Sequence, residues 1–280
     1  MKTREIRIPA GEHTPDPVHI RWEFPDCGAE TKLSLHVGSG ARVMVIEELA
    51  TGSGPGSEWS HAVEVHLEEG ADVEFVSEQI ADASVHLTLS QRSHLGDNAK
   101  ISWRNVTLGG KNVEHELTSE LTGADAVSTI DWMFYAKNEE KYQLNARNIF
   151  TGRHGSGEIT MKGVAEGKGH VQCNGKIEIG VGGGETDTYL TQDVLMLDKT
   201  AKVDAIPGLE IKTNDVKASH SATVSRVTEE DLFYFAARGI IEKEARRMFV
   251  EGFLGEMVGK IGSQTAREEI LASVEGKYGI

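Results

Sequence analysis

The sequence predicts an all-β body followed by a small α-helical segment. Between about residues 30 and 225, short segments alternate apolar and polar residues with the period of two that a β-strand requires. From residue 227 onward, apolar residues recur at intervals of three and four, the period of a helix with one buried face. At 280 residues, of which 39% are hydrophobic and 26% charged, the chain is long enough to bury a sizeable core.

Several segments of the body have the alternation and the β-branched or large apolar residues of strands. The first alternating segment turns at Gly70 and continues beyond it. The strand candidates are EVHLEEGADVEF (64–75), AKISWRNVTL (99–108), GEITMKGV (157–164), HVQCNGKIEI (170–179) and YLTQDVLML (189–197).

A weak repeat places alanine after a turn residue and before a strand. The repeat is clearest at Ala41, Ala71 and Ala99, and we assign Ala124 and Ala201 to it as well. A small residue that recurs at a corner is what a coiled β-solenoid needs, because adjacent coils pack closely there. An antiparallel sandwich or jelly roll alternates equally well, so the pattern alone leaves both architectures open.

The last fifty residues predict three helices. Thr228 is the expected N-cap of the first, followed by acidic residues, and Gly239 is its expected end. The third helix is expected from about 265 to 277. Its inward side chains are Ile270, Leu271 and Val274; the stripe of the second helix is Ala245, Met248, Phe249, Gly252, Phe253 and Met257. The predicted organisation is thus an N-terminal segment (1–30), a β body (31–226) and a helical region (227–280).

Composition excludes several classes of partner. Twenty-nine basic and forty-four acidic side chains give a net charge of −15, so a nucleic-acid partner is not expected. No segment reaches the ~18 apolar residues of a membrane span, and the N-terminus has no apolar stretch of a signal peptide. The two cysteines, Cys27 and Cys173, cannot form a disulfide framework and fit a reducing compartment, so we expect a cytoplasmic protein.

Catalytic and nucleotide-binding motifs are missing from the sequence. The Gly-Lys pair in GEMVGKI has the wrong spacing for a phosphate-binding loop, and no Gly-x-Ser-x-Gly motif occurs. His170 and Cys173, like His61 and His66, have odd spacings that send them to opposite faces of a strand. An alternative function is a carbohydrate-active β-helix or β-sandwich enzyme with paired carboxylates. Its candidate acids are Glu185, Asp187, Asp193 and Asp198.

One ionisable residue stands on an apolar face. In NDVKASHSATV (214–224), alternation places His220 on the same face as Val216, Ala218, Ala222 and Val224. The strand pattern by itself favours a buried histidine whose ring nitrogens bond backbone groups.

Residues 189–253 resemble the SufB/SufD family, the scaffold components of the SUF iron–sulfur cluster assembly system. The segments that carry the resemblance are AIPGLEI, NDVKASHSATV, DLFYFAARGI and EARRMFVEGF, with looser likeness in AKISWRNV and MKGVAEGKGHVQCNGKIEI. This resemblance implies a right-handed parallel β-helix followed by a C-terminal helical segment. It also implies a protein that is not itself an enzyme, and whose N-terminal helical extension is missing or very short.

The resemblance further implies a SufC-type ABC ATPase as a partner, docked on the helical region 227–280. The residues in the matching segment are Phe233, Tyr234, Arg238, Gly239, Phe249 and Phe253. The second implied partner is a SufB-like subunit or a second copy of this chain. No stably bound cofactor is implied, but at most a transient Fe–S cluster at the subunit interface.

Within the resemblance, His220 occupies the position of a SufD histidine at the cluster assembly interface. Neutral imidazole is a suitable ligand for iron, so His220 becomes the candidate metal ligand. Gln192 stands where SufB has a cysteine, and Ser219 and Ser221 replace the acids that flank the SufB histidine. The chain therefore looks SufD-like, and Cys173 has no implied role beyond a structural one.

Overall fold

The computed structural model describes residues 2–24, 29–51 and 57–278. Cys27 lies outside these residues. Within the described ranges, no helix combines the length and apolarity that a membrane span requires.

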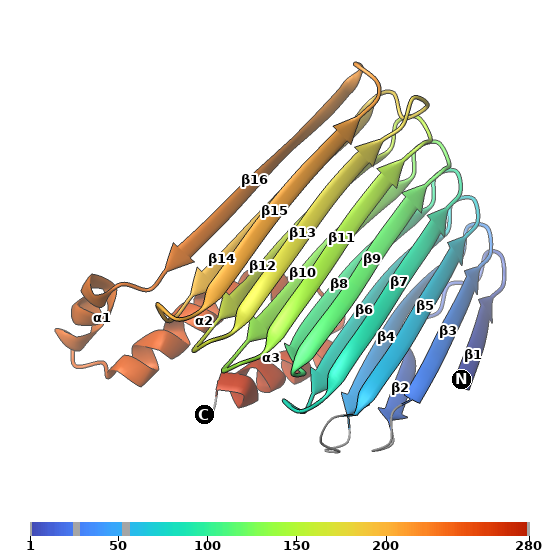
Figure 1. The fold of residues 1–280 in the computed structure, drawn as a ribbon. Coiled ribbons are helices and arrows are strands. Elements are labelled where there is room, and N and C mark those ends of the chain that lie inside the picture. Colours follow the sequence, from blue (N-terminus) through green and yellow to red (C-terminus); the bar gives the residue numbers. More distant parts are fainter. Residues whose placement is uncertain (1, 25–28, 52–56, 279–280) are drawn as a thin grey trace.

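In the described part of the chain, sixteen strands form two parallel sheets of eight strands each, and the chain alternates between the sheets (Figure 1). Sheet A has the order β1 (Lys2–Ile8), β3 (Ala29–Val37), β5 (Glu58–Leu67), β7 (His86–Leu95), β9 (Asn112–Leu121), β11 (Lys141–Phe150), β13 (His170–Ile179) and β15 (Lys202–Ile211). Sheet B has the order β2 (Val18–Phe24), β4 (Arg42–Thr51), β6 (Asp72–Ala81), β8 (Lys100–Gly109), β10 (Val127–Ala136), β12 (Ser156–Ala165), β14 (Thr186–Met196) and β16 (Val216–Arg226).

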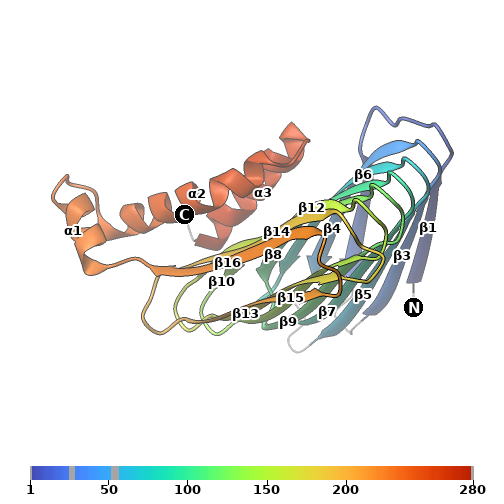
Figure 2. The ribbon, with the colours of Figure 1, turned by 90° about the horizontal axis from the view of Figure 1, so that it is seen from above.

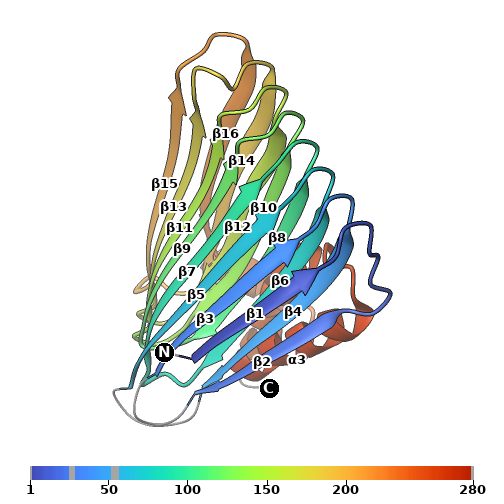
Figure 3. The same cartoon turned by 90° about the vertical axis from the view of Figure 1, so that its right-hand side faces the viewer.

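Each strand pairs with the strand one coil further along the chain, which defines a parallel β-solenoid (Figure 3). The prediction of a parallel β-helix is confirmed, and the sandwich or jelly-roll alternative is wrong. An antiparallel sandwich would pair strands in opposite directions, whereas every pair of strands here is parallel.

The alanine repeat marks one corner of the solenoid. Ala41, Ala71 and Ala99 are fully buried, and each follows a turn residue with positive φ. The next member is the buried Ala126, which follows Asp125 (φ 56°), whereas Ala124 is half-buried. The assignment of Ala124 was therefore wrong, because Asp125 and not glycine adopts the left-handed turn conformation.

Ala201 belongs to a different corner, where the chain enters sheet A. It is buried and precedes Lys202, whose N–H donates to Gly169 O at 2.9 Å.

The core fills the space between the sheets with stacked side chains. Trp22, Trp103 and Trp132 are among the largest of its fully buried residues. The Asn174–Gly175 pair lies inside β13 and not in a hairpin. A Cβ at Gly175 would stand 2.5 Å from Leu190 Cδ1 of the opposing sheet, so a larger residue there would force the buried Leu190 side chain to move.

The helical region follows the last strand and folds back over sheet B. It contains α1 (Glu229–Ala236), α2 (Glu242–Gly259) and α3 (Gln264–Tyr278), which agrees with the three predicted helices. Thr228 and Asp231 form a capping box at the start of α1. Figure 2 shows α2 and α3 along the outer face of sheet B, where they contact β8, β10 and β12.

The buried faces of α2 and α3 differ in part from the predicted stripes. Val250 and Leu254 pack into the apolar cluster beneath α2, whereas the predicted Met248 is 42% exposed. In α3, Ile270 and Val274 are buried as predicted, but Leu271 is 40% exposed. The face of each helix that is buried against sheet B is narrower than the set of its apolar residues suggests. Gly252 is also exposed.

A buried ion pair fixes the end of α3 to the solenoid. Lys277 Nζ donates to Glu140 Oε1 at 2.7 Å and Oε2 at 2.6 Å, and Glu140 is 5% exposed. The Tyr142 hydroxyl also donates to Glu140 Oε2 at 2.8 Å. Glu140 therefore depends on Lys277 to balance its buried charge.

We predict that Lys277→Met lowers the free energy of unfolding by about 3 kcal/mol, because it leaves the Glu140 carboxylate buried without its counter-charge. Urea titration followed by circular dichroism measures this change. The control is Lys168→Met, since Lys168 pairs with Glu139 on the exposed surface and its loss should cost less than about 1 kcal/mol. Equal effects of the two substitutions would contradict the role of the buried pair.

Candidate functional site

The last coil of the solenoid presents one unpaired edge in each sheet. β15 and β16 stand at the ends of the two strand orders and hydrogen-bond only to β13 and β14 among the described strands. Figure 1 shows these strands at the end of the solenoid opposite β1 and β2. Ile206, Ile211 and Val224 of this coil are 51%, 41% and 47% exposed. An exposed edge of this kind is a template for pairing with another chain.

His220 points inward but is exposed to solvent. It pairs in register with Leu190 of β14, which is fully buried between the sheets. Parallel register gives paired residues the same direction, so the predicted inward face of β16 is confirmed. No described coil follows β16, and His220 is consequently exposed and not the buried histidine that the strand pattern favoured.

Gln192 lies one coil below the exposed face and is completely buried. It pairs with Ala222, and its Nε2 donates to Cys173 O at 3.0 Å. The position that the resemblance equates with the SufB cysteine is thus an amide inside the core. This residue cannot offer a ligand to the open end of the solenoid.

Cys173 is also closed off from solvent. It is buried on the inner face of β13, and burial raises the pKa of its thiol to about 12. His170 lies on the outer face of the same strand, where its Nε2 is 2.8 Å from Asp204 Oδ2. The two residues do not form a site, as their odd spacing predicts. His61 points inward and His66 outward in the same way.

Among the predicted docking residues, the structure places Phe233 and Tyr234 on the exposed helix α1 and Arg238 in the turn directly after it. Phe233 is 73% and Tyr234 55% exposed, and α1 has no buried residue. The Arg238 guanidinium lies 3.5 Å from the centroid of the Tyr234 ring, a cation–π contact. Gly239, with φ of 78°, ends the turn after α1. In Figure 2, α1 projects past the end of the solenoid.

Phe249 and Phe253 of α2 lie deeper. Both are half-buried; Phe249 makes an edge contact with Phe235 at 5.4 Å between ring centroids, and Lys162 Nζ lies 4.9 Å from the Phe253 centroid. Two further apolar residues of the helical region are exposed, Ile241 (70%) just before α2 and Met248 (42%) within it. The exposure of Met248 could not be predicted from the sequence, since a methionine at this spacing fits the buried apolar stripe of a helix equally well.

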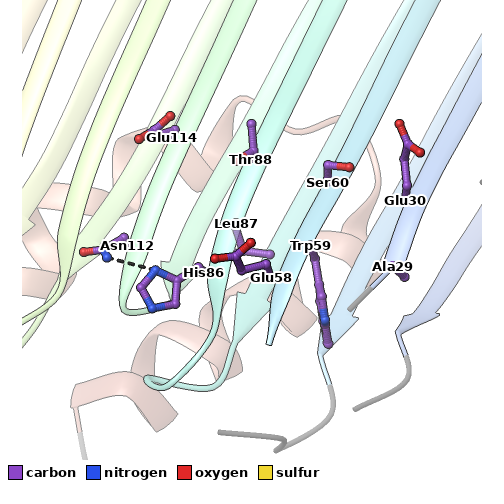
Figure 4. Close-up of a pocket in the computed structure, with 10 residues that line it drawn as sticks. All are labelled: Ala29, Glu30, Glu58, Trp59, Ser60, His86, Leu87, Thr88, Asn112 and Glu114. Atoms are coloured by element: carbon purple, nitrogen blue, oxygen red, sulfur yellow. Dashed lines mark hydrogen bonds between the residues drawn. The ribbon is translucent and has the colours of Figure 1, made fainter. Parts of the chain in front are cut away.

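A hollow of about 670 Å³ lies over the start of four strands of sheet A (Figure 4). Asn112 Nδ2 and His86 Nδ1, 2.9 Å apart, are joined by a hydrogen bond across it. Glu30 and Glu114 stand at opposite ends of a row, with Ser60 and Thr88 between them. Two intervening strands separate these acids by about 14 Å, too far for the paired carboxylates of a glycosidase.

We predict that Cys173 resists thiol reagents in the folded protein. The thiolate is the reactive form, and a buried thiol with a raised pKa supplies almost none at pH 8. In a Cys27→Ser variant, iodoacetamide should label the protein at least about 100-fold faster in 6 M guanidinium than in buffer. Comparable rates under both conditions would show that Cys173 is accessible.

Comparison with known proteins agrees with this architecture. A family model for the SufBD core domain of SUF-system FeS cluster assembly matches residues 25–253. A Mycobacterium leprae protein, named as an iron–sulfur cluster assembly SufBD family protein, is 29% identical over 273 residues, which cover 92% of this chain and 68% of that protein. A second such M. leprae protein is 25% identical over 266 residues, covering 94% of this chain but only 31% of its own length.

A Mycobacterium tuberculosis protein of the same family name is 30% identical over 205 residues, which cover 70% of this chain and 51% of that protein. The chain therefore spans between about a third and about two thirds of these three relatives. The family match extends over more than half of the chain and includes both the terminal coil and α1. The chain belongs to the SufBD family of iron–sulfur cluster assembly proteins.

Proposed function

We propose that this chain is a SufD-like scaffold in a cytoplasmic iron–sulfur cluster assembly complex, without catalytic activity of its own. The observation that carries the proposal is the open terminal coil, which exposes two sheet edges and the inward-facing His220. Membership of the SufBD family supports a role in iron–sulfur cluster assembly. The scaffold role, the SufD-like character and the partners are our inferences from this surface and from the resemblance.

The proposed subunit interface is the edge formed by β15 and β16. Both strands have free backbone N–H and C=O groups along one side, and a partner strand would satisfy them. A partner docked there would also cover Ile206, Ile211 and Val224. We propose a SufB-like subunit as this partner, with a second copy of this chain as the alternative outcome.

At this interface, His220 is the proposed ligand for a transient Fe–S cluster. Its ring faces the open interior above Leu190 and is accessible to a ligand set completed by the partner. Gln192 and Cys173 are buried below it, so thiolates must come from elsewhere in the complex. A histidine-only contribution from this chain fits a cluster that is held weakly and passed on.

The proposed docking surface for a SufC-type ABC ATPase is α1 with the segment after it. Exposed aromatic residues next to an arginine are characteristic of the centres of protein interfaces. Phe233, Tyr234 and Arg238 provide this combination, with Ile241 beside them. An ATPase partner also accounts for a chain that has no nucleotide-binding motif of its own. Gly239, Phe249 and Phe253 support α1 in this proposal.

We predict that the double substitution Phe233→Ser/Tyr234→Ser weakens ATPase binding by roughly 1000-fold, since each of the two aromatic residues buried in an interface contributes about 2 kcal/mol. The chain and the ATPase are purified separately, and calorimetry measures the affinity between them. Leu271→Ser is the matched control, because Leu271 is exposed on α3, away from α1. Unchanged affinity in the double variant would place the ATPase elsewhere.

We predict that His220→Ala abolishes formation of the Fe–S cluster without dissociating the proposed complex of this chain with its partners. The purified complex is reconstituted anaerobically with iron and sulfide, and visible absorption reports the cluster. His19→Ala is the control, because His19 is exposed on β2 at the opposite end of the solenoid. If wild type and His220→Ala acquire the same cluster, His220 is not a ligand and the scaffold proposal rests on α1 and the sheet edges.

A further inference from the structure

Three histidines form a stack on the outer face of sheet A, far from the terminal coil. His36 of β3, His66 of β5 and His94 of β7 share one register position. Neighbouring rings are 4.9 Å apart between centroids, with 10° between their planes in both pairs. The three strands lie side by side near the β1 end of the sheet (Figure 1). The solenoid thus gathers residues that are widely separated in the sequence.

A carboxylate stands beside this stack. Glu64 precedes His66 by two residues on β5 and therefore projects from the same face. Its Oε1 is 3.5 Å from His66 Nε2 and 4.0 Å from His94 Nε2. One ligand atom from each of Glu64, His66 and His94 lies within 4.8 Å of the other two.

A neighbouring carboxylate orients the ring of His94. His94 Nδ1 is 3.0 Å from Glu120 Oε2, which places the ring proton on Nδ1 and leaves the Nε2 lone pair free.

Three stacked histidine rings gain little stabilisation from one another at this position. On the same sheet, Asn145 and Asn174 also stand side by side, but Asn174 Nδ2 donates a hydrogen bond of 2.7 Å to Asn145 Oδ1. Face-to-face imidazole rings cannot bond to each other in this way, and they repel one another when protonated. A cation shared by the ring nitrogens would turn the stack into a favourable arrangement.

We propose that Glu64, His66 and His94 bind a divalent first-row transition-metal ion on the outer face of sheet A. Two imidazoles and one carboxylate form a donor set used for zinc and for ferrous iron. Metal binding would require the side chains of His66 and His94 to rotate out of the stacked arrangement, so that both Nε2 atoms face the ion. A neighbouring hollow of about 240 Å³, lined in part by His36, His66 and Glu68, provides room for water at the open coordination positions.

The test is a titration with Co²⁺, whose visible d–d absorption reports coordination by the protein. It is performed in a Cys27→Ser/His220→Ala background, so that neither that thiol nor the proposed cluster ligand contributes. We expect one saturable site in this background, and His66→Ala or His94→Ala should weaken Co²⁺ binding by at least about 10-fold. Glu64→Gln keeps the size of the side chain and should weaken binding to a similar extent.

His170→Ala is the matched control, because His170 pairs with a carboxylate on the outer face of the same sheet but lies outside the stack. It should bind Co²⁺ with unchanged affinity. Circular dichroism verifies that each variant is folded. The proposal is overturned if the stack variants bind as tightly as the background protein, or if equimolar Mg²⁺ displaces Co²⁺, since a hard ion competes equally only for diffuse acidic sites. Either result leaves the His220 experiment unaffected.

Discussion

The parallel, in-register stacking of successive coils determines the rest of this structure. Every residue of a strand lies directly beside the equivalent residue of the next coil, joined through backbone hydrogen bonds. Small residues must then recur where coils turn tightly, as Ala41, Ala71, Ala99 and Ala126 do. Large apolar residues stack between the sheets, and polar residues form rows on the outer faces. Core, corners and surface rows thus all follow from one pairing rule.

The same rule leaves the end of the solenoid open. The backbone N–H and C=O groups at the edge of a coil find hydrogen-bond partners only when another coil stacks on it, so β15 and β16 expose one edge each. The helical region does not cover this end. Instead, α2 and α3 fold back onto sheet B, fixed by contacts such as Lys277–Glu140, while α1 projects beyond the coil. The two surfaces on which the proposed function depends are therefore consequences of where the chain goes after its last strand.

On the outer faces, register brings charged side chains of consecutive coils together. Lys32 pairs with Glu64 and Lys176 with Glu210, each between neighbouring strands of sheet A. These exposed pairs contribute little to stability individually, but they keep a chain of net charge −15 from concentrating acids in one row. The histidine stack follows the same rule, since Glu64 and Glu120 lie beside His66 and His94, and register alone brings these nitrogen and oxygen ligands together.

The sequence alone determined the strand alternation, the three helices, the inward face of 214–224 and, through its resemblance, the family. These features depend on residues that are close in sequence. The strand pattern could not distinguish a solenoid from a sandwich, since alternation is identical in both. The pattern also predicted the wrong corner residue at Ala124, and it predicted buried side chains at Met248 and Leu271, which are exposed. Only the tertiary structure decided the exposure of His220 and the meeting of Glu64, His66 and His94. Exposure depends on which coil is last, and the histidine stack depends on the register between coils, neither of which any local stretch of sequence contains.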